Sequence, residues 1–289
     1  MSRLPHRPAH RSSPRALVRA VAAPALAGVL VLGLAPAAPA LPSSEPATSG
    51  LATSGLATAV SAPQQRKPLA GVTVVLDPGH QLGNKNFPEE INRLVQAGGF
   101  KKACNTTGTA TNKGWPEATF VWQLAVRTRK KLRRLGATVR LTRHSNREDR
   151  WGPCINTRGK AGARYDADVL LSLHGDGSTT SGARGFHVIR PTKRKGWTGD
   201  IWKPSRRLAR TLKRAMKRQG FPVANYVAGG TGIDARGDLG TLNLSDVPAV
   251  LLEAGNMRNR RDARAMRRTA GQRRYAAALV ATVRRFTGN

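Results

Sequence analysis

Four residues of this 289-residue chain are of the types that bind and use a metal ion: His80, Glu117, His174 and Glu253. Two histidines and one carboxylate can hold a zinc ion and leave its fourth coordination position open to water. A second carboxylate beside that water can accept its proton. Together, the four residue types predict a site for metal-assisted hydrolysis.

Each of these residues also has an ordinary structural interpretation. A histidine that follows a strand commonly serves as a turn residue or a satisfied polar group. Glu117 follows Pro116 at the predicted start of a helix, where a carboxylate stabilises the helix dipole by up to about 1 kcal/mol. Glu253 follows three apolar residues, and burying its carboxylate there is costly unless a partner compensates. Spacing alone leaves the choice open, because the chain has no short-range metal motif such as His-Glu-x-x-His.

The segments around these residues alternate between strand and helix patterns. Apolar, β-branched runs predict buried strands at 72–76, 137–142, 169–173, 185–189 and 247–252. Helical spacing of apolar residues predicts helices at 116–135, 155–165, 204–219 and 262–286. This alternation predicts a single α/β domain with a mostly parallel, twisted sheet and helices on both faces. Reactive groups gather at the carboxyl ends of such strands, which would bring His80, His174 and Glu253 together.

Two segments precede the predicted domain. Residues 1–40 combine five arginines and no acidic residue with an apolar run at 20–34 and the sequence Ala38-Pro39-Ala40, which predicts a cleaved signal peptide. An uncleaved anchor helix is the alternative, although the run is short for a membrane span. Residues 41–68 are small, polar and proline-bearing, which predicts a flexible linker. We expect an exported protein, in the cell wall or the periplasm, with a catalytic domain at 69–289 and no stable membrane span after cleavage.

The chain is strongly basic, with 49 basic and 16 acidic residues and a formal net charge of +33. This charge excludes an ordinary near-neutral enzyme surface and indicates a polyanion nearby, such as nucleic acid, an anionic membrane or a cell-wall polymer. The basic side chains that could form a binding face are Arg206, Arg207, Arg210, Lys213, Arg214, Lys217, Arg218, Arg258, Arg260, Arg261 and Arg264. Retention on an anionic wall polymer and a merely solvated basic surface both remain open.

Four ordered segments resemble the zinc-dependent N-acetylmuramoyl-L-alanine amidases of the type 3 family, over about residues 70–288. The segment 74–80 resembles the family's first strand and zinc histidine, and 167–174 resembles the segment with its second histidine. Glu117 matches a metal-binding glutamate that opens a long helix, and 248–259 resembles the closing motif with its catalytic glutamate. The stretch 236–239 sits where the family carries a similar Arg-Gly sequence.

The resemblance implies a phosphorylase/hydrolase-like fold and an enzyme that cleaves the amide between N-acetylmuramic acid and L-alanine in peptidoglycan. It implies that His80, Glu117 and His174 bind Zn²⁺ and that Glu253 is the general base. Histidine ligands usually donate their second ring N–H to a carboxylate or a carbonyl. Asp77 and Asp176 are candidates for this role, and turn-stabilising roles are equally open for both.

One departure from the family lies between His80 and Glu117, where the separation of 37 positions is longer than in compact members. Residues 82–114 therefore look like an inserted loop, with a short helix predicted at 88–97. Glu89 and Glu90 within it compete with Glu117 for the third ligand position. A second departure is His187, which stands where the family often carries an acidic residue, and we assign it no role.

Cys104 and Cys154 are the only cysteines, so at most one disulfide can form. Outside the membrane, a bridge is favoured over two free thiols. The bridge would join the insertion to the loop before residue 155 and restrict its movement over the metal site.

Two other functions remain open: a basic protein that binds nucleic acid or cell wall without catalysis, and a zinc peptidase that acts within the stem peptide. Aromatic residues make up only 5% of the chain, and no helix-turn-helix, RNA-binding or zinc-finger pattern is present, so we expect no specific nucleic-acid partner. No apolar surplus indicates an interface, and we expect a monomer.

Overall fold

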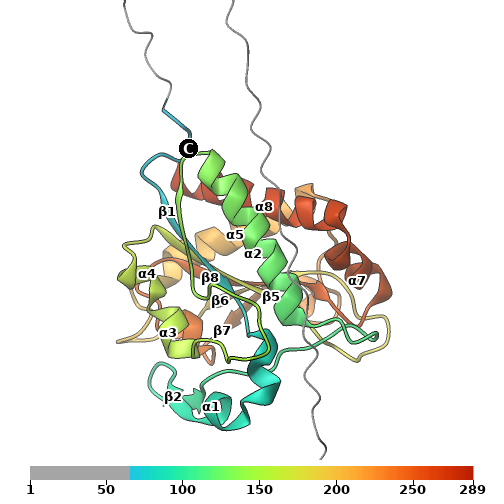
Figure 1. The fold of residues 1–289 in the computed structure, drawn as a ribbon. Coiled ribbons are helices and arrows are strands. Elements are labelled where there is room, and N and C mark those ends of the chain that lie inside the picture. Colours follow the sequence, from blue (N-terminus) through green and yellow to red (C-terminus); the bar gives the residue numbers. More distant parts are fainter. Residues whose placement is uncertain (1–65, 289) are drawn as a thin grey trace, which may run out of the picture. The chain divides into compact units, whose positions relative to one another are not determined.

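The computed structural model describes residues 66–288, and Figure 1 shows how their helices and strands are arranged. The signal peptide expected at 1–40 and nearly all of the linker expected at 41–68 lie outside the described residues. None of the helices within residues 66–288 has the length and hydropathy needed to cross a membrane.

Six strands form the main sheet, in the spatial order β4-β1-β5-β8-β6-β7. Their bounds are β1 Thr73–Pro78, β4 Thr138–Leu141, β5 Val169–Asp176, β6 His187–Pro191, β7 Ile233–Arg236 and β8 Ala249–Asn256. The strands β4, β1, β5 and β8 pair in parallel, β6 is antiparallel to β8, and β7 is parallel to β6. The predicted mostly parallel sheet is confirmed, and each of the five predicted strands overlaps an observed one. Of the six strands in this sheet, only β7, which is short and half polar, was not predicted.

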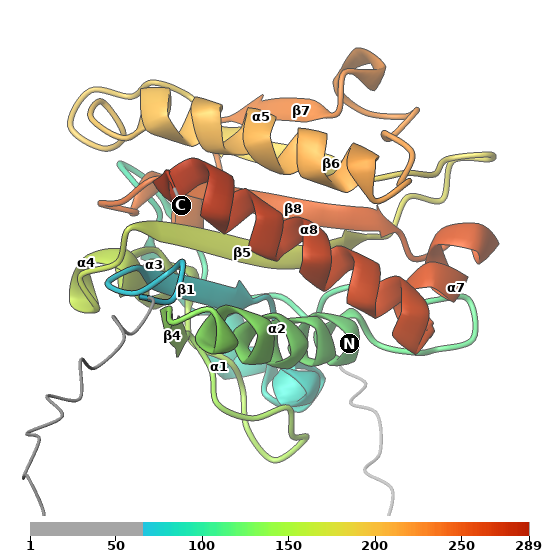
Figure 2. The same ribbon diagram turned by 90° about the horizontal axis from the view of Figure 1, so that it is seen from above.

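Helices cover both faces of the sheet, as predicted. The long helices α2 (Glu117–Arg134), α8 (Thr269–Thr287) and α5 (Trp202–Arg218) lie side by side on one face (Figure 2). The short helices α3 (Ile155–Gly159), α4 (Ala161–Arg164) and α6 (Gly240–Asn243) cover the other face. A hydrophobic core lies on each face of the sheet. Because alternate side chains of a strand point to opposite faces, Leu171 of β5 packs in the core under the long helices and Leu170 in the core under the short helices.

The helix predicted at 262–286 is divided into α7 (Arg260–Arg267) and α8, with Arg268 between them in an extended conformation. Carbonyl groups at a helix C-terminus lack helical partners, and the Gln272 side-chain amide donates a hydrogen bond to one of them, that of Met266. The helix predicted at 155–165 is likewise divided into α3 and α4. Helical periodicity continues across both breaks, so the sequence pattern did not reveal them.

The insertion at 82–114 forms a 3₁₀ helix (Leu82–Asn86), α1 (Pro88–Asn92) and a hairpin of β2 (Leu94–Gln96) and β3 (Lys101–Ala103). The helix predicted at 88–97 is therefore wrong in its second half, which is a strand. The Gln96 side chain accepts hydrogen bonds from the N–H groups of Ala97, Gly98 and Gly99. Both glycines have left-handed backbone angles, φ +94° and +88°, which form the hairpin turn. The helix itself ends before Arg93, whose ψ of 138° is not helical.

Candidate metal centre

Neighbouring strands place the two histidines and Glu253 at one edge of the sheet. His174 on β5 is in register with Glu253 on the adjacent strand β8, and β1 lies on the other side of β5. His80 follows β1 with a φ of +56°, in a left-handed conformation that residues other than glycine rarely adopt. Glu117 is the first residue of α2, which packs on this part of the sheet. The four residues singled out in the sequence thus come from four elements that meet at one place.

Two glycines make room for the crowded side chains at this edge. A Cβ atom at Gly79 would lie only 2.2 Å from the Cε1 atom of His174, so no other residue fits there without displacing the ring. A Cβ atom at Gly108 would lie 2.9 Å from Glu117 Oε2, and the φ of +78° at this glycine also disfavours a side chain. The close approach of the backbone is therefore built into the sequence at both positions.

The ligand-capable atoms of His80, Glu117 and His174 lie close enough to share one ion. His80 Nε2 is 3.1 Å from Glu117 Oε1 and 3.1 Å from His174 Nδ1, and these last two atoms are 2.9 Å apart. Ligands at zinc distances of about 2.0–2.2 Å in a tetrahedron are about 3.3 Å apart, and catalytic zinc takes this donor set. The residues present therefore fit the ion. Within residues 66–288 they form the one group of three such side chains able to hold a metal.

The competing glutamates of the insertion are not part of this group. Glu89 and Glu90 lie on α1, and Glu89 is exposed. Glu117, by contrast, is only 3% exposed. Of these three carboxylates, only Glu117 lies in the group of described side chains that could hold a metal ion.

Glu117 is held as an anion by its surroundings. Its Oε2 accepts the N–H of Thr109 at 2.9 Å, and its Oε1 accepts the N–H of Gly175 at 3.0 Å. Burial by itself raises the pKa of this carboxyl, but His80 and His174 outweigh burial and hold the pKa of Glu117 well below its ordinary value. Burial lowers the pKa of His174, whereas at His80 the lowering by burial is overcome by Glu117 and the pKa rises. An anionic carboxylate beside two imidazoles is the state that a cation requires.

A backbone carbonyl of the insertion orients His80. Its Nδ1 lies 3.0 Å from the Thr106 oxygen, and donation of the Nδ1–H to this oxygen leaves the lone pair of Nε2 facing the other two candidate ligands. The Asn84 amide donates to the same oxygen at 2.6 Å. The Asn84 side-chain oxygen in turn accepts the N–H of Gly152 at 2.8 Å. Asn84 therefore ties the carbonyl that orients His80 to the segment before α3.

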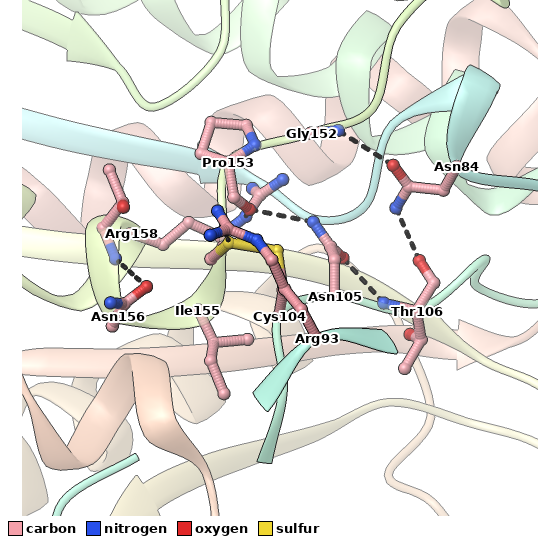
Figure 3. Close-up of a disulfide and its surroundings, with 12 residues drawn as sticks. Asn84, Arg93, Cys104, Asn105, Thr106, Gly152, Pro153, Ile155, Asn156 and Arg158 are labelled. Atoms are coloured by element: carbon pink, nitrogen blue, oxygen red, sulfur yellow. Dashed lines mark hydrogen bonds between the residues drawn. A yellow bond between two sulfur atoms is a disulfide. The ribbon is translucent and has the colours of Figure 1, made fainter. Parts of the chain in front are cut away.

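The disulfide expected between Cys104 and Cys154 is present (Figure 3). It joins the insertion covalently to the segment before α3. Beside it, the Asn105 amide donates to the carbonyl of Pro153 at 2.8 Å, and its side-chain oxygen accepts the N–H of Thr106 at 2.9 Å. The bridge and the two asparagines together fix the position of residue 106 next to the metal centre.

Asp77 does not bond a histidine. This carboxylate is buried and accepts hydrogen bonds from Arg158 Nη1 at 2.6 Å and Ser172 Oγ at 2.6 Å. Burial raises the pKa of Asp77, but Arg158 and the hydroxyl donors overcome it, and the pKa is lowered. Arg158 also donates to the His80 carbonyl at 2.7 Å. Of the two roles left open by the sequence, Asp77 has the structural one, which supports the turn that carries His80.

Asp176 also stabilises a turn and bonds no histidine. Its Oδ1 accepts the N–H of Gly177, and its Oδ2 accepts the hydroxyl proton of Tyr226 at 2.8 Å. The Tyr226 ring meets His187 edge-on, with 6.3 Å between ring centroids. Sequence reasoning missed Tyr226, because it lies in a loop with no recognisable pattern.

A cavity of about 270 Å³ opens on the metal centre, and Glu253 and Arg236 line it together with the three candidate ligands. Glu253 Oε2 is buried and has no hydrogen-bond partner among residues 66–288. Burial, and then the charge of Glu117, raises the pKa of Glu253 well above its ordinary value. Arg236 is held by Asp238 through two hydrogen bonds of 2.8 Å and 2.7 Å. A carboxyl group in this setting can exchange a proton with a molecule bound in the cavity.

Comparison with known proteins agrees with this geometry. Residues 74–285 match the sequence pattern of a family described as N-acetylmuramoyl-L-alanine amidase. The chain is 38% identical over 221 residues to the N-acetylmuramoyl-L-alanine amidase Rv3717 of Mycobacterium tuberculosis, covering 75% of this chain and 87% of that one. The crystal structure of the N-acetylmuramyl-L-alanine amidase Ami1 of Mycobacterium smegmatis is similar with a TM-score of 0.70 and 34% identity, over 76% of this chain and 98% of that one. The apo form of Ami1 from Mycobacterium abscessus is similar with a TM-score of 0.70 and 36% identity, over 76% and 100%.

Proposed function

The chain belongs to the family of N-acetylmuramoyl-L-alanine amidases, and on this premise we propose that it works with a zinc ion held by His80, Glu117 and His174 and with Glu253 as the general base. The enzyme is a peptidoglycan amidase, which cleaves the amide bond between N-acetylmuramic acid and L-alanine. The observation that carries the proposal is the meeting of three ligand atoms, 2.9–3.1 Å apart, with an unpartnered carboxylate oxygen that lines the same cavity.

Glu253 has the properties of a proton carrier. A zinc ion at this centre would polarise the substrate carbonyl and lower the pKa of a water molecule to about 7. As water attacks the carbonyl carbon, Glu253 accepts the proton that the water loses. Glu253 then delivers the proton to the alanine nitrogen as the C–N bond breaks. The products are a lactyl carboxylate and a free alanine amino terminus.

The proposal extends to the organisation of the whole chain. Residues 1–40 are removed on export as a signal peptide, residues 41–68 form a flexible linker, and residues 69–289 form the catalytic domain. Support comes from the leader sequence, from the family match at 74–285 and from the location of peptidoglycan outside the cytoplasmic membrane. The enzyme is then secreted and acts in the cell wall or the periplasm.

The central test counts the L-alanine amino termini released from purified peptidoglycan and measures zinc in the same samples. Glu253→Gln is expected to lower the rate by about 10²–10⁴-fold, because a general base is lost, while zinc stays at one ion per chain. Glu117→Gln is expected to lose the zinc as well as the activity. A chelator should abolish cleavage, and added zinc should restore it.

The matched controls are Glu89→Gln and Glu90→Gln, which remove the other candidate carboxylates and are expected to keep both zinc and activity. Loss of zinc from Glu253→Gln would move Glu253 into the ligand set. Cleavage that survives complete removal of metal would end the zinc proposal. New amino termini of residues other than L-alanine would favour a peptidase acting within the stem.

A further inference from the structure

A groove of about 650 Å³ lies between α7 and the loop 111–114, and we name it the α7 groove. Six of the residues that line it are basic, and none is acidic. The basic residues are Lys113, Arg258, Arg260, Arg264, Arg267 and Arg268. Positive charge is therefore concentrated in a concave surface.

The basic side chains of the α7 groove lack acidic partners in the part of the chain that the structure describes. Within residues 66–288, no carboxylate forms an ion pair with any of the six. The single acidic residue of α7, Asp262, is buried, and its Oδ2 accepts the N–H groups of Gly185 at 2.6 Å and Asn256 at 3.0 Å. The carboxylate of Asp262 therefore bonds main-chain groups inside the fold and does not neutralise the arginines of α7. These arginines are available to an external anion.

The spacing of the arginines favours an anion with several charges. Arg260, Arg264 and Arg267 share one side of α7 and extend over about 10 Å at a rise of about 1.5 Å per residue. Like charges at this spacing repel one another and disfavour the helix. A chain with negative charges at regular intervals can pair with all three arginines along the length of the row. Guanidinium groups bind phosphate oxygens with paired hydrogen bonds, and a chain of phosphodiesters presents such oxygens at regular intervals.

Nucleic acid is a poorer match to the same groove. Proteins that bind single strands stack the bases on aromatic side chains. No aromatic residue lines the α7 groove. Phosphate groups without bases are therefore the chemistry that this surface fits.

Shared lining residues relate the α7 groove to the candidate metal centre through a second hollow. Arg258 lines both the α7 groove and a second hollow of about 800 Å³. Thr109, Asp176 and Gly177 line this second hollow and also the cavity at the metal centre. The Asn112 amide donates to the Arg258 carbonyl at 3.1 Å and ties the loop to the start of α7. A polymer in the groove would lie beside the path by which substrate reaches the site.

We propose that the α7 groove binds a phosphodiester polymer attached to peptidoglycan and thereby holds the enzyme on its substrate. The placement beside substrate rests on the proposed function. Binding itself requires neither the metal nor Glu253, so the two proposals can fail separately.

The test measures the affinity of the protein for poly(glycerol phosphate) over a series of salt concentrations, with zinc and again with chelator. The groove variant carries Arg260→Gln, Arg264→Gln and Arg267→Gln. Its affinity is expected to fall by at least about tenfold. The plot of log affinity against log salt has a negative slope. Its magnitude is expected to decrease by about 0.7–0.9 for each phosphate group that the variant no longer neutralises. Chelator should change neither value.

The matched control carries Arg206→Gln, Arg210→Gln and Arg214→Gln. These exposed arginines lie on one side of α5 and form no ion pair, so the control removes the same charge from another helix. Its affinity is expected to stay within about twofold of the parent. Equal weakening in both variants would mean that net charge alone attracts the polymer, and it would overturn the proposal.

Two further measurements complete the test. Poly-L-glutamate of equal charge is expected to bind at least about tenfold more weakly than the phosphate polymer, and equal binding would overturn the assignment to phosphate. The single change Arg264→Glu, at the centre of the row, disturbs α7 less than three substitutions do. It is expected to weaken binding of the phosphate polymer at least about fivefold, and unchanged affinity would also overturn the proposal.

Discussion

Glu117 and Glu253 line one cavity but have opposite environments. Glu117 faces two imidazoles and two N–H donors, which hold its pKa well below the ordinary value. Glu253 has a buried oxygen without a partner, and burial raises its pKa well above the ordinary value. Neighbouring carboxyl groups with separated pKa values commonly divide the roles of anion and proton carrier. This difference at the residue scale supports Glu117 as the ligand and Glu253 as the base.

The raised pKa of Glu253 predicts a stability cost in the metal-free enzyme. A carboxyl whose pKa is higher in the folded state contributes stability that is fully present below its unfolded pKa and is lost as the pH rises through the folded value. Glu253→Gln is therefore expected to raise the unfolding temperature of the metal-free protein, by an amount that grows as the pH rises above about 4.5. Thermal unfolding with chelator at several pH values measures this. A Glu253→Gln protein that is less stable at pH 8 than at pH 4, relative to the parent, would contradict the sign.

Asp77 and Arg158 form a buried pair whose loss is expected to destabilise the fold. Asp77→Asn leaves the Arg158 guanidinium, 3% exposed, without its carboxylate, which typically costs about 3–5 kcal/mol. The pKa of Asp77 is lowered in the folded state, so its contribution is present above the unfolded value and is lost as the pH falls below about 4. Urea unfolding is expected to show a large difference between parent and variant at pH 7 and a smaller one near pH 3. The exposed pair Arg147–Asp149 provides the control, because solvent screens this pair and Asp149→Asn should change stability much less than Asp77→Asn does.

At the scale of elements, the insertion and the loop before α3 act as one support for His80. The disulfide Cys104–Cys154 joins segments 50 residues apart, and Asn84 and Asn105 continue the link to Thr106. Replacing both cysteines with serine is expected to cost about 2–4 kcal/mol of stability, because the unfolded chain gains freedom. The same change is expected to weaken zinc binding by about 10–100-fold, because the carbonyl that orients His80 is held less firmly.

The Asn84→Ala variant separates the two effects of the bridge. It removes the hydrogen bond to the Thr106 oxygen and leaves the disulfide in place. Zinc affinity, measured by competition with a chelating dye, is expected to fall although the chain remains crosslinked. Unchanged zinc affinity in both Asn84→Ala and the double serine variant would show that the insertion does not position His80.

At the scale of the whole molecule, both hydrophobic cores are formed by residues between Leu69 and Phe286. Chains that begin at residue 41 and at residue 66 are therefore expected to hydrolyse a soluble muropeptide at rates within about twofold of each other. Steady-state kinetics of the two proteins check this. A tenfold loss on removal of residues 41–65 would show that this segment is more than a linker. Amino-terminal sequencing of the exported enzyme should begin at Leu41 if the leader is cleaved as proposed.

Local patterns in the sequence were sufficient to predict the class of fold. The runs at 72–76, 169–173 and 247–252 are apolar on both faces, and this pattern occurs where helices cover a strand from both sides. The helix at 116–135 shows its start at Pro116 and its end at Gly136. Buried positions carry apolar residues, and their spacing differs between strands and helices. The strands, the long helices and the mostly parallel pairing of the sheet could therefore be predicted.

The candidate site was visible for a different reason. His80, Glu117, His174 and Glu253 carry chemistry in their side chains. His174 and Glu253 stand in the carboxyl-terminal half of a strand, His80 just after a strand and Glu117 at the start of a helix. The sequence favoured Glu117 over Glu89 and Glu90 because Glu117 stands at a predicted helix start, but it could not show which carboxylate lies near the histidines. Only the position of α2 relative to β5 brought the Glu117 oxygen within 2.9 Å of His174 Nδ1.

What the sequence determined was therefore the type and local setting of each reactive side chain, because these depend on neighbours along the chain. The tertiary structure alone decided which main-chain groups serve them. The carbonyl of Thr106 orients His80, and the N–H groups of Thr109 and Gly175 hold Glu117, yet every residue has such groups. Their selection depends on contacts between segments 8 to 58 residues apart, and no residue type records those contacts.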